Sequence, residues 1–153
     1  MLMRLTLALC AAICAATFAP IAATAQEVVD VSGAAAAPMA QIRAQAGLRQ
    51  LAPSAALTKA AAAHARDMSK NGFFSHRGSN GSSIGDRARK ARYGFCFIAE
   101  NIAKGQGSLD QVMSGWMKSE GHRRNILSPQ ASEFALVRGE GALWVMVLGR
   151  PGC

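Results

Sequence analysis

The segment Trp116-Met117-Lys118-Ser119-Glu120-Gly121-His122-Arg123-Arg124-Asn125-Ile126-Leu127 joins a helical pattern to a dense group of polar side chains. Its first residues continue an apolar face that starts at Leu109 and repeats at helical spacing. Residues 108–111, Ser-Leu-Asp-Gln, have the order of a capping box and predict where this helix begins. We expect Gly121 to interrupt the helix and the remaining residues to add one more turn before Pro129.

Three earlier segments also carry helix signals. Pro38 suits the first position of a helix that Gly47 would end. Ser54 is expected to cap a second, alanine-rich helix that ends at Asn71-Gly72. Residues 83–86, Ser-Ile-Gly-Asp, predict a capping box at the start of a third helix.

The strand signals lie mainly in the C-terminal half. Residues 95–98 predict a short buried strand, followed by a loop over 99–107. Residues 134–137 and 143–148 are two β-rich runs, and Gly139-Glu140-Gly141 between them predicts an antiparallel hairpin. Because helices and strands do not strictly alternate, the predicted class is α+β with a mostly antiparallel sheet.

Composition limits the chain to a single globular domain. Of its 153 residues 50% are hydrophobic, and 17 Lys and Arg against 9 Asp and Glu give a net charge of +8. This hydrophobic share excludes a disordered chain, and the length fits one domain. No internal repeat is present, which excludes a solenoid or a propeller.

The N-terminus predicts a signal peptide. Arg4 precedes an apolar run over 5–19 that is too short to cross a hydrocarbon core of about 30 Å. Ala23-Thr24-Ala25 has the small-x-small pattern of a cleavage site, and an uncleaved anchor is the alternative. We therefore expect a cleaved signal peptide (1–25), an extended lead-in (26–37), a single domain (38–153), and export to the periplasm or the medium.

Cleavage would leave two cysteines. Cys10 and Cys14 lie in the signal segment, so Cys96 and Cys153 would remain in the mature chain. An oxidising compartment allows them one pairing. We expect a Cys96–Cys153 disulfide, and two free thiols are the alternative.

Three motifs together resemble the CAP superfamily, also called SCP/PR-1, and most closely its secreted bacterial branch. They are Phe74-Ser75-His76, Glu100-Asn101-Ile102-Ala103 and the segment over 116–127. The resemblance runs from about Met39 to Gly149 and includes the spacing Arg43-x-x-x-Gly47-x-x-x-Leu51. It implies a three-layer α-β-α sandwich with a mostly antiparallel central sheet.

The resemblance also implies a cleft lined by two histidines and two acidic residues. His76 matches the first histidine and Glu100 the first acid, and His122 is the best candidate for the second histidine. The second acid has no clear match, because Ser119 stands where relatives often carry Glu, and Glu120 is next to it. We therefore expect His76, Glu100, His122, Ser119 and Glu120 to line the cleft.

Two interpretations of these residues stay open. Neutral imidazoles and a carboxylate are ligands for a divalent metal such as zinc, so His76, His122 and Glu100 are candidate metal ligands. Alternatively, they brace loops through hydrogen bonds, as we expect of Asn101. His64 lies on the alanine-rich face of its helix and is assigned to structure or surface.

Basic residues crowd the third helix. Arg87, Arg89, Lys90 and Arg92 could hold anionic envelope polymers, and a solvated helix face is the alternative. Export argues against a nucleic-acid partner, and we expect a monomer.

Three functions compete. The first is a binding module for a small ligand, a lipid or a divalent metal. The second is a hydrolase in which a metal or the His76–Glu100 pair activates water. The third is a structural envelope protein that binds anionic polymers through its basic helix.

Overall fold

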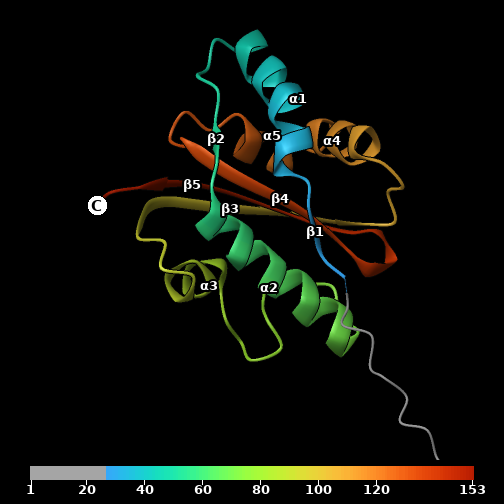
Figure 1. The fold of residues 1–153 in the computed structure, drawn as a ribbon. Helices are drawn as coiled ribbons and strands as arrows, with labels where there is room; N and C mark the ends of the chain where they lie inside the picture. The colour runs from blue at the N-terminus through green and yellow to red at the C-terminus, as the bar shows by residue number, and fades with distance from the viewer. Residues whose placement is uncertain (1–26) are drawn as a thin grey trace, which may run out of the picture.

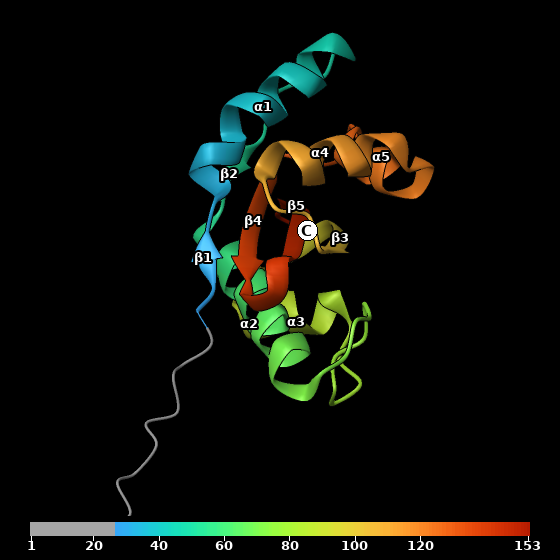
Figure 2. The same cartoon turned by 90° about the vertical axis from the view of Figure 1, so that its right-hand side faces the viewer.

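The computed structural model describes residues 27–153, and a five-stranded sheet lies between two layers of helices (Figure 1). Helices α1 (Ser32–Gln45), α4 (Leu109–Lys118) and α5 (Glu120–Ile126) cover one face, and α2 (Ala55–Asn71) and α3 (Ile84–Lys90) cover the other. Figure 2, turned by 90°, shows the same three layers edge-on. The predicted α+β sandwich is confirmed.

The sheet is mostly antiparallel, as predicted. Its strands are β1 (Val29–Asp30), β2 (Ala52–Pro53), β3 (Phe95–Lys104), β4 (Glu133–Gly139) and β5 (Leu143–Pro151). Their order is β1-β4-β5-β3, and β2 pairs in parallel with the first residues of β4, on the edge that β1 also uses. The expected hairpin joins β4 to β5 through a turn in which Gly141 has a φ of 66°.

The core has two halves, one on each face of the sheet. Phe134 and Leu136 of β4 point toward α1 and α4, whereas Ala135 and Val137 point toward α2. This alternation follows from the two-residue period of a strand. Because β4 and β5 are buried on both faces, they read as continuous apolar runs.

Local sequence signals placed several helix ends correctly. The reciprocal capping box of Ser83 and Asp86 is present at the start of α3. Helix α2 begins after Ser54 and ends at Gly72, whose φ of 66° is readily adopted by glycine. Ser108 caps α4 by accepting a hydrogen bond from the Gln111 amide.

The N-terminal lead-in differs from the prediction. Extended backbone stops near Val31, and α1 begins at Ser32 instead of near Pro38, which lies inside the helix. The Asp30 carboxylate accepts hydrogen bonds from the Ser32 amide and hydroxyl, at 2.9 and 2.6 Å. The alanines that follow are the best helix formers, so the helix starts earlier than Pro38 suggested. The predicted signal peptide, 1–25, lies outside the described residues.

The loop expected over 99–107 is mostly wrong. Strand β3 continues to Lys104 and pairs with β5 along its whole length, with Glu100 opposite Val147. Pairing satisfies the backbone of this segment, so two consecutive polar residues can lie in a buried strand when their side chains find partners. Glu100 and Asn101 therefore project from a rigid strand.

Two further findings complete the description of the fold. The predicted disulfide is present: Cys96 and Cys153 are bonded, with their Cα atoms 5.2 Å apart. Within residues 27–153, no helix is both long enough and apolar enough to cross a membrane.

Candidate functional site

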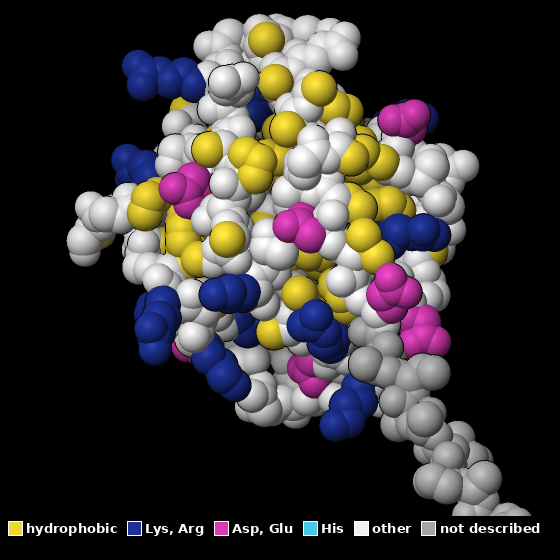
Figure 3. All heavy atoms as spheres, in the orientation of Figure 1, with side chains coloured by type: hydrophobic (Ala, Val, Ile, Leu, Met, Phe, Trp, Pro, Cys, Tyr) yellow, Lys and Arg dark blue, Asp and Glu magenta, His cyan; other side chains and the backbone are white. Residues whose placement is uncertain are grey.

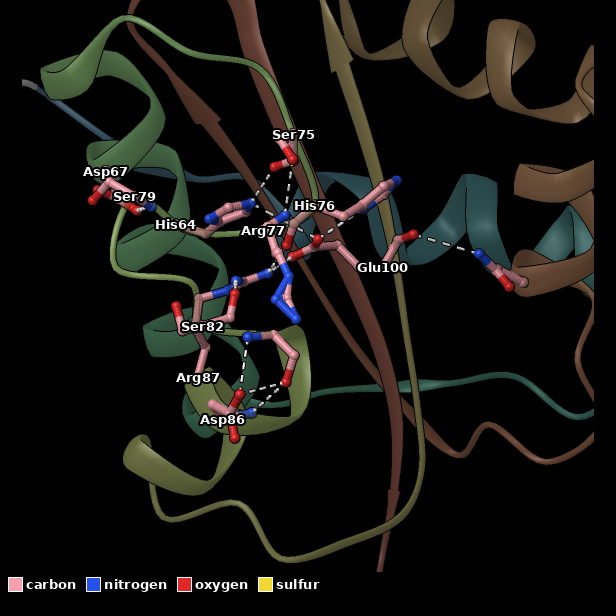
Figure 4. A network of polar contacts seen from close by, with 12 residues as sticks. His64, Asp67, Ser75, His76, Arg77, Ser79, Ser82, Asp86, Arg87 and Glu100 are labelled. Atoms are coloured by element: carbon pink, nitrogen blue, oxygen red, sulfur yellow. Dashed lines mark hydrogen bonds and ion pairs between the residues drawn. The ribbon is translucent and has the colours of Figure 1, made fainter.

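Glu100 is the centre of a polar network between β3 and the α2–α3 layer. Its carboxylate is buried, with a side-chain exposure of 2%. Figure 4 shows three side chains approaching it: His64 from α2, His76 from the segment after α2, and Arg87 from α3.

Both carboxylate oxygens of Glu100 have close partners. Oε1 lies 2.9 Å from Nδ1 of His76, and Oε2 accepts a hydrogen bond from Nη2 of Arg87 at 2.8 Å. Arg87 also donates to the carbonyls of His76 (3.1 Å) and Ser82 (2.9 Å). The guanidinium thus neutralises Glu100 and holds the loop that carries His76.

His64 is the second buried polar group of this network. Its Nε2 lies 2.8 Å from the carbonyl oxygen of Ser75 and 3.9 Å from Oε1 of Glu100. A carbonyl only accepts, so Nε2 carries the proton and donates it. Nδ1 is then an acceptor, and it has no partner among the described residues. Burial lowers the pKa of His64, which keeps the ring neutral.

His122 belongs to a second cluster, on α5. Its Nδ1 lies 2.9 Å from the Ser119 hydroxyl, and its ring centroid is 6.4 Å from that of Trp116. Burial lowers the pKa of His122, and its electrostatic interaction with His76 lowers this pKa further. The ring is therefore neutral near pH 7, with its Nε2 left for another partner.

Asn101 ties the second cluster to the sheet. Its Nδ2 donates to the carbonyl of His122 at 3.1 Å, and its Oδ1 accepts from Asn125 at 2.8 Å. Asn125 also donates to the backbone carbonyl of Glu100 at 3.4 Å. These bonds brace α5 against β3, the role expected for Asn101.

The structure brings together some expected cleft residues and separates others. His76 contacts Glu100, and Ser119 contacts His122. Glu120 is exposed in the first turn of α5 and makes no hydrogen bond or ion pair to the Glu100 network. Ser119 orients a histidine and supplies no charge, so neither residue is a second acid beside Glu100.

Sequence reasoning missed the buried role of Arg87. Arg87 was expected on the basic surface, yet it is 7% exposed and paired with Glu100. Arg87 and Ala88 follow Ile84 at three and four residues, so one helix face carries all three, a signal that could have placed Arg87 inward. We had assigned His64 to structure or surface. It is fully buried on the apolar face of α2, which agrees with the first of these two alternatives.

An apolar pocket of about 310 Å³ adjoins His122. Its lining includes Phe74, Ile102, Gly115, Trp116, Ser119 and His122. Phe74 is a large apolar side chain with 48% exposure. The pocket therefore offers a neutral imidazole and a hydroxyl beside aromatic and aliphatic surface, and Lys104 and Gln106 add two further polar side chains to its lining.

The residues present do not fit a zinc ion. In the part of the chain from 27 to 153, no three His, Cys, Asp or Glu side chains are placed to hold a metal, so His76, Glu100 and His122 do not form such a group. One oxygen of Glu100 already binds the fixed positive charge of Arg87. Arg87 thus provides the positive charge that a metal ion would bring to Glu100.

Solved structures of other proteins share this fold. An extracellular protein of Bacillus anthracis that contains an SCP domain matches with a TM-score of 0.69 and 29% identity, over 73% of this chain and 37% of that protein. An outer surface protein of Borrelia burgdorferi matches with a TM-score of 0.73 and 19% identity, over 83% of this chain and 99% of that protein.

Sequence comparison gives a consistent result. The chain is 35% identical over 103 residues to the Bacillus subtilis protein YkwD, a match that spans 67% of this chain but only 40% of YkwD. The family model for the cysteine-rich secretory protein family, CAP, matches residues 37–145. With this match over more than half its length and the α-β-α sandwich around Glu100, the chain belongs to the cysteine-rich secretory protein (CAP) family.

Proposed function

We propose that the protein is an exported binding module whose cleft takes a small amphipathic molecule. The polar end of the ligand would face His122 and His76, and its apolar body would fill the pocket beside Trp116. Export is supported by the apolar run over 5–19, the disulfide, and the similarity to a protein named as extracellular and to one named as an outer surface protein.

The observation that carries the proposal is that polar and apolar side chains line one and the same pocket. Ligand sites are concave and mostly apolar, with a few polar groups that fix orientation. The pocket has this composition, and its volume of about 310 Å³ lies at the small end of ligand sites. The neutral ring of His122 has Nδ1 engaged by Ser119, so Nε2 can bond a hydroxyl or a carboxylate of the ligand.

The two competing functions have weaker support. The hydrolase hypothesis has no second carboxylate beside Glu100, and Glu100 itself is 2% exposed and paired with Arg87. Arg87, one of the four basic residues expected to bind an anionic polymer, is buried and therefore not available on the surface of α3. Figure 3 shows Lys and Arg side chains on the α2–α3 side of the molecule, and exposed Arg89 is partly held by Asp86 at 3.4 Å.

Filling the pocket tests the proposal. Gly115 lines the pocket, and a Cβ placed on it meets no atom within 4 Å, so Gly115→Leu adds volume without a backbone clash. Leucine also favours a helix over glycine by about 0.8 kcal/mol, so the variant should fold. We expect decanoate, used as the probe, to change the fluorescence of Trp116 in the wild type and to bind Gly115→Leu at least about tenfold more weakly, since one blocked contact of about 1.4 kcal/mol suffices.

Gly115→Ala is the matched control and should keep most of the affinity, because one methyl group fills little of the pocket. Equal decanoate binding by wild type and Gly115→Leu would contradict a ligand in this pocket. No binding by the wild type, together with ester hydrolysis that His76→Ala abolishes, would favour the hydrolase instead.

A further inference from the structure

A second pocket, made of different residues, lies where the end of α1, the α5–β4 connection and the end of β5 meet. In Figure 1 the α5–β4 connection and the end of β5 lie on the side of the C-terminal residue, and the end of α1 lies above them. The pocket has a volume of about 390 Å³, and its polar lining consists of Arg43, Arg49, Gln50, Gln130, Ser132 and Arg150. Three guanidinium groups therefore line it, and none of its described lining residues is Asp or Glu.

Arg43 is the unusual member of this group because its charge is buried. The residue is 1% exposed, and its hydrogen bonds go only to backbone carbonyls: Nε to Arg49 at 2.7 Å, and Nη1 to Ile126 at 2.7 Å and Ser128 at 3.0 Å. Among the ion pairs of residues 27–153, none includes Arg43. Burial lowers its pKa, as expected for a cation without a carboxylate.

The three carbonyls stabilise Arg43 only in part. Ile126 is the last residue of α5, where the backbone carries partial negative charge, whereas Ser128 follows this helix and Arg49 lies in the loop after α1. Buried charges are normally paired with an opposite charge. Nη2 of Arg43 donates to no described residue, and Arg43 is one of the residues that line the pocket.

The acids nearest in sequence do not neutralise the pocket. Glu133 follows Ser132 but lies on the other face of the sheet, where it raises the pKa of Tyr93 after the effect of burial. Arg150 and Arg49 are both exposed, so their charges are free to turn toward a bound anion.

We propose that this pocket binds a phosphate group carried by a small molecule or a lipid headgroup. Arginine forms paired hydrogen bonds with phosphate oxygens, and three arginines match a dianionic phosphate monoester better than a single carboxylate. The volume of about 390 Å³ exceeds that of one phosphate and leaves room for the group that carries it. The site shares no residue with the pocket beside His122, so it does not depend on the proposed ligand there.

Phosphate titration tests the site without disturbing Arg43, whose loss would free the ends of two helices. The probes are inorganic phosphate and glycerol 3-phosphate, followed by ³¹P NMR and by the thermal midpoint at constant ionic strength. We expect both to bind the wild type, and Arg49→Gln/Arg150→Gln to weaken binding by at least about tenfold, because the double variant loses two charge-assisted hydrogen bonds to the phosphate.

Lys59→Gln/Arg66→Gln is the control, because both residues are exposed on α2, outside the pocket, and each double variant removes two positive charges. Equal weakening by Lys59→Gln/Arg66→Gln, or a phosphate effect no larger than that of chloride, would overturn the site in favour of diffuse attraction. Vesicles containing phosphatidate separate the sources: sedimentation with them that is lost in Arg49→Gln/Arg150→Gln points to a headgroup, and binding of glycerol 3-phosphate without sedimentation points to a soluble ester.

Discussion

Glu100 depends on partners that come from elements far apart in the chain. Its two oxygens bind His76 and Arg87, and its backbone carbonyl receives Asn125. A carboxylate that is 2% exposed is tolerated only because these partners replace water. Arg87 also donates to the carbonyl of His76, so the Glu100–Arg87 ion pair fixes the loop that carries this histidine.

Replacing only one partner of the Arg87–Glu100 ion pair should destabilise the protein more than replacing both partners. Arg87→Met leaves a buried carboxylate without its cation and should lower the free energy of unfolding by about 3 kcal/mol. In Arg87→Met/Glu100→Gln the loss should be at least about 1 kcal/mol smaller than the sum of the two single losses. Urea denaturation of the four proteins at pH 7 measures this coupling. Lys90→Met, exposed on the same helix, should change stability by less than about 0.5 kcal/mol, and additive single losses would contradict the coupling.

At the scale of elements, the sequence predicted what short-range signals determine. The Ser83–Asp86 capping box, the Gly72 helix end and the β4–β5 hairpin depend on residues a few positions apart, and all three were predicted correctly. The length of β3 depends on its pairing with β5, which follows only after two helices and another strand, so the loop expected after Ile98 was wrong. Arg87 shows the same limit, because its burial depends on a carboxylate in another layer.

The candidate site divides in the same way. Family resemblance supplied His76, Glu100 and His122, and the first two make a contact that spacing alone could not have predicted. The sequence could not predict whether further ligands or a second acid would lie beside Glu100, because this depends on the three-dimensional fold. In the structure Arg87 occupies the place beside Glu100, Glu120 is exposed, and no three His, Cys, Asp or Glu side chains in residues 27–153 are placed to hold a metal.

Strand β5 meets the segment before β3 at a position that permits no side chain. A Cβ on Gly149 would lie 2.8 Å from the ring of buried Tyr93. Overpacking of this kind costs about 1–3 kcal/mol, so Gly149→Ala should lower the urea midpoint, and Tyr93→Leu in the same chain should restore part of the loss. Gly94→Ala, with no atom within 4 Å of the new Cβ, is the control. A larger loss in the double variant than in Gly149→Ala would argue against a clash.

At the scale of the whole molecule, the stability of the sandwich should fall in mildly acid solution. Burial lowers the pKa of both His64 and His122, so below about pH 6.5 the unfolded chain binds protons that the native chain does not. Stability therefore rises with pH through this window and falls as pH drops toward the lowered values. Hydrogen bonds from Ser79 and Ser83 hold the pKa values of Asp67 and Asp86 below their usual range. The stability that these two carboxylates contribute is therefore lost in a separate window, as pH falls below about 4.

His64→Gln should isolate the contribution of the α2 histidine. Glutamine can still donate to the Ser75 carbonyl, and it does not titrate. Each buried histidine contributes a slope of at most about 1.4 kcal/mol per pH unit, so urea denaturation between pH 5 and 7 should show a shallower dependence in this variant. Glu100 favours and Arg87 opposes protonation of His64, but burial outweighs both. A slope unchanged by His64→Gln yet lost in His122→Gln would place the acid sensitivity in the cleft and not beneath it.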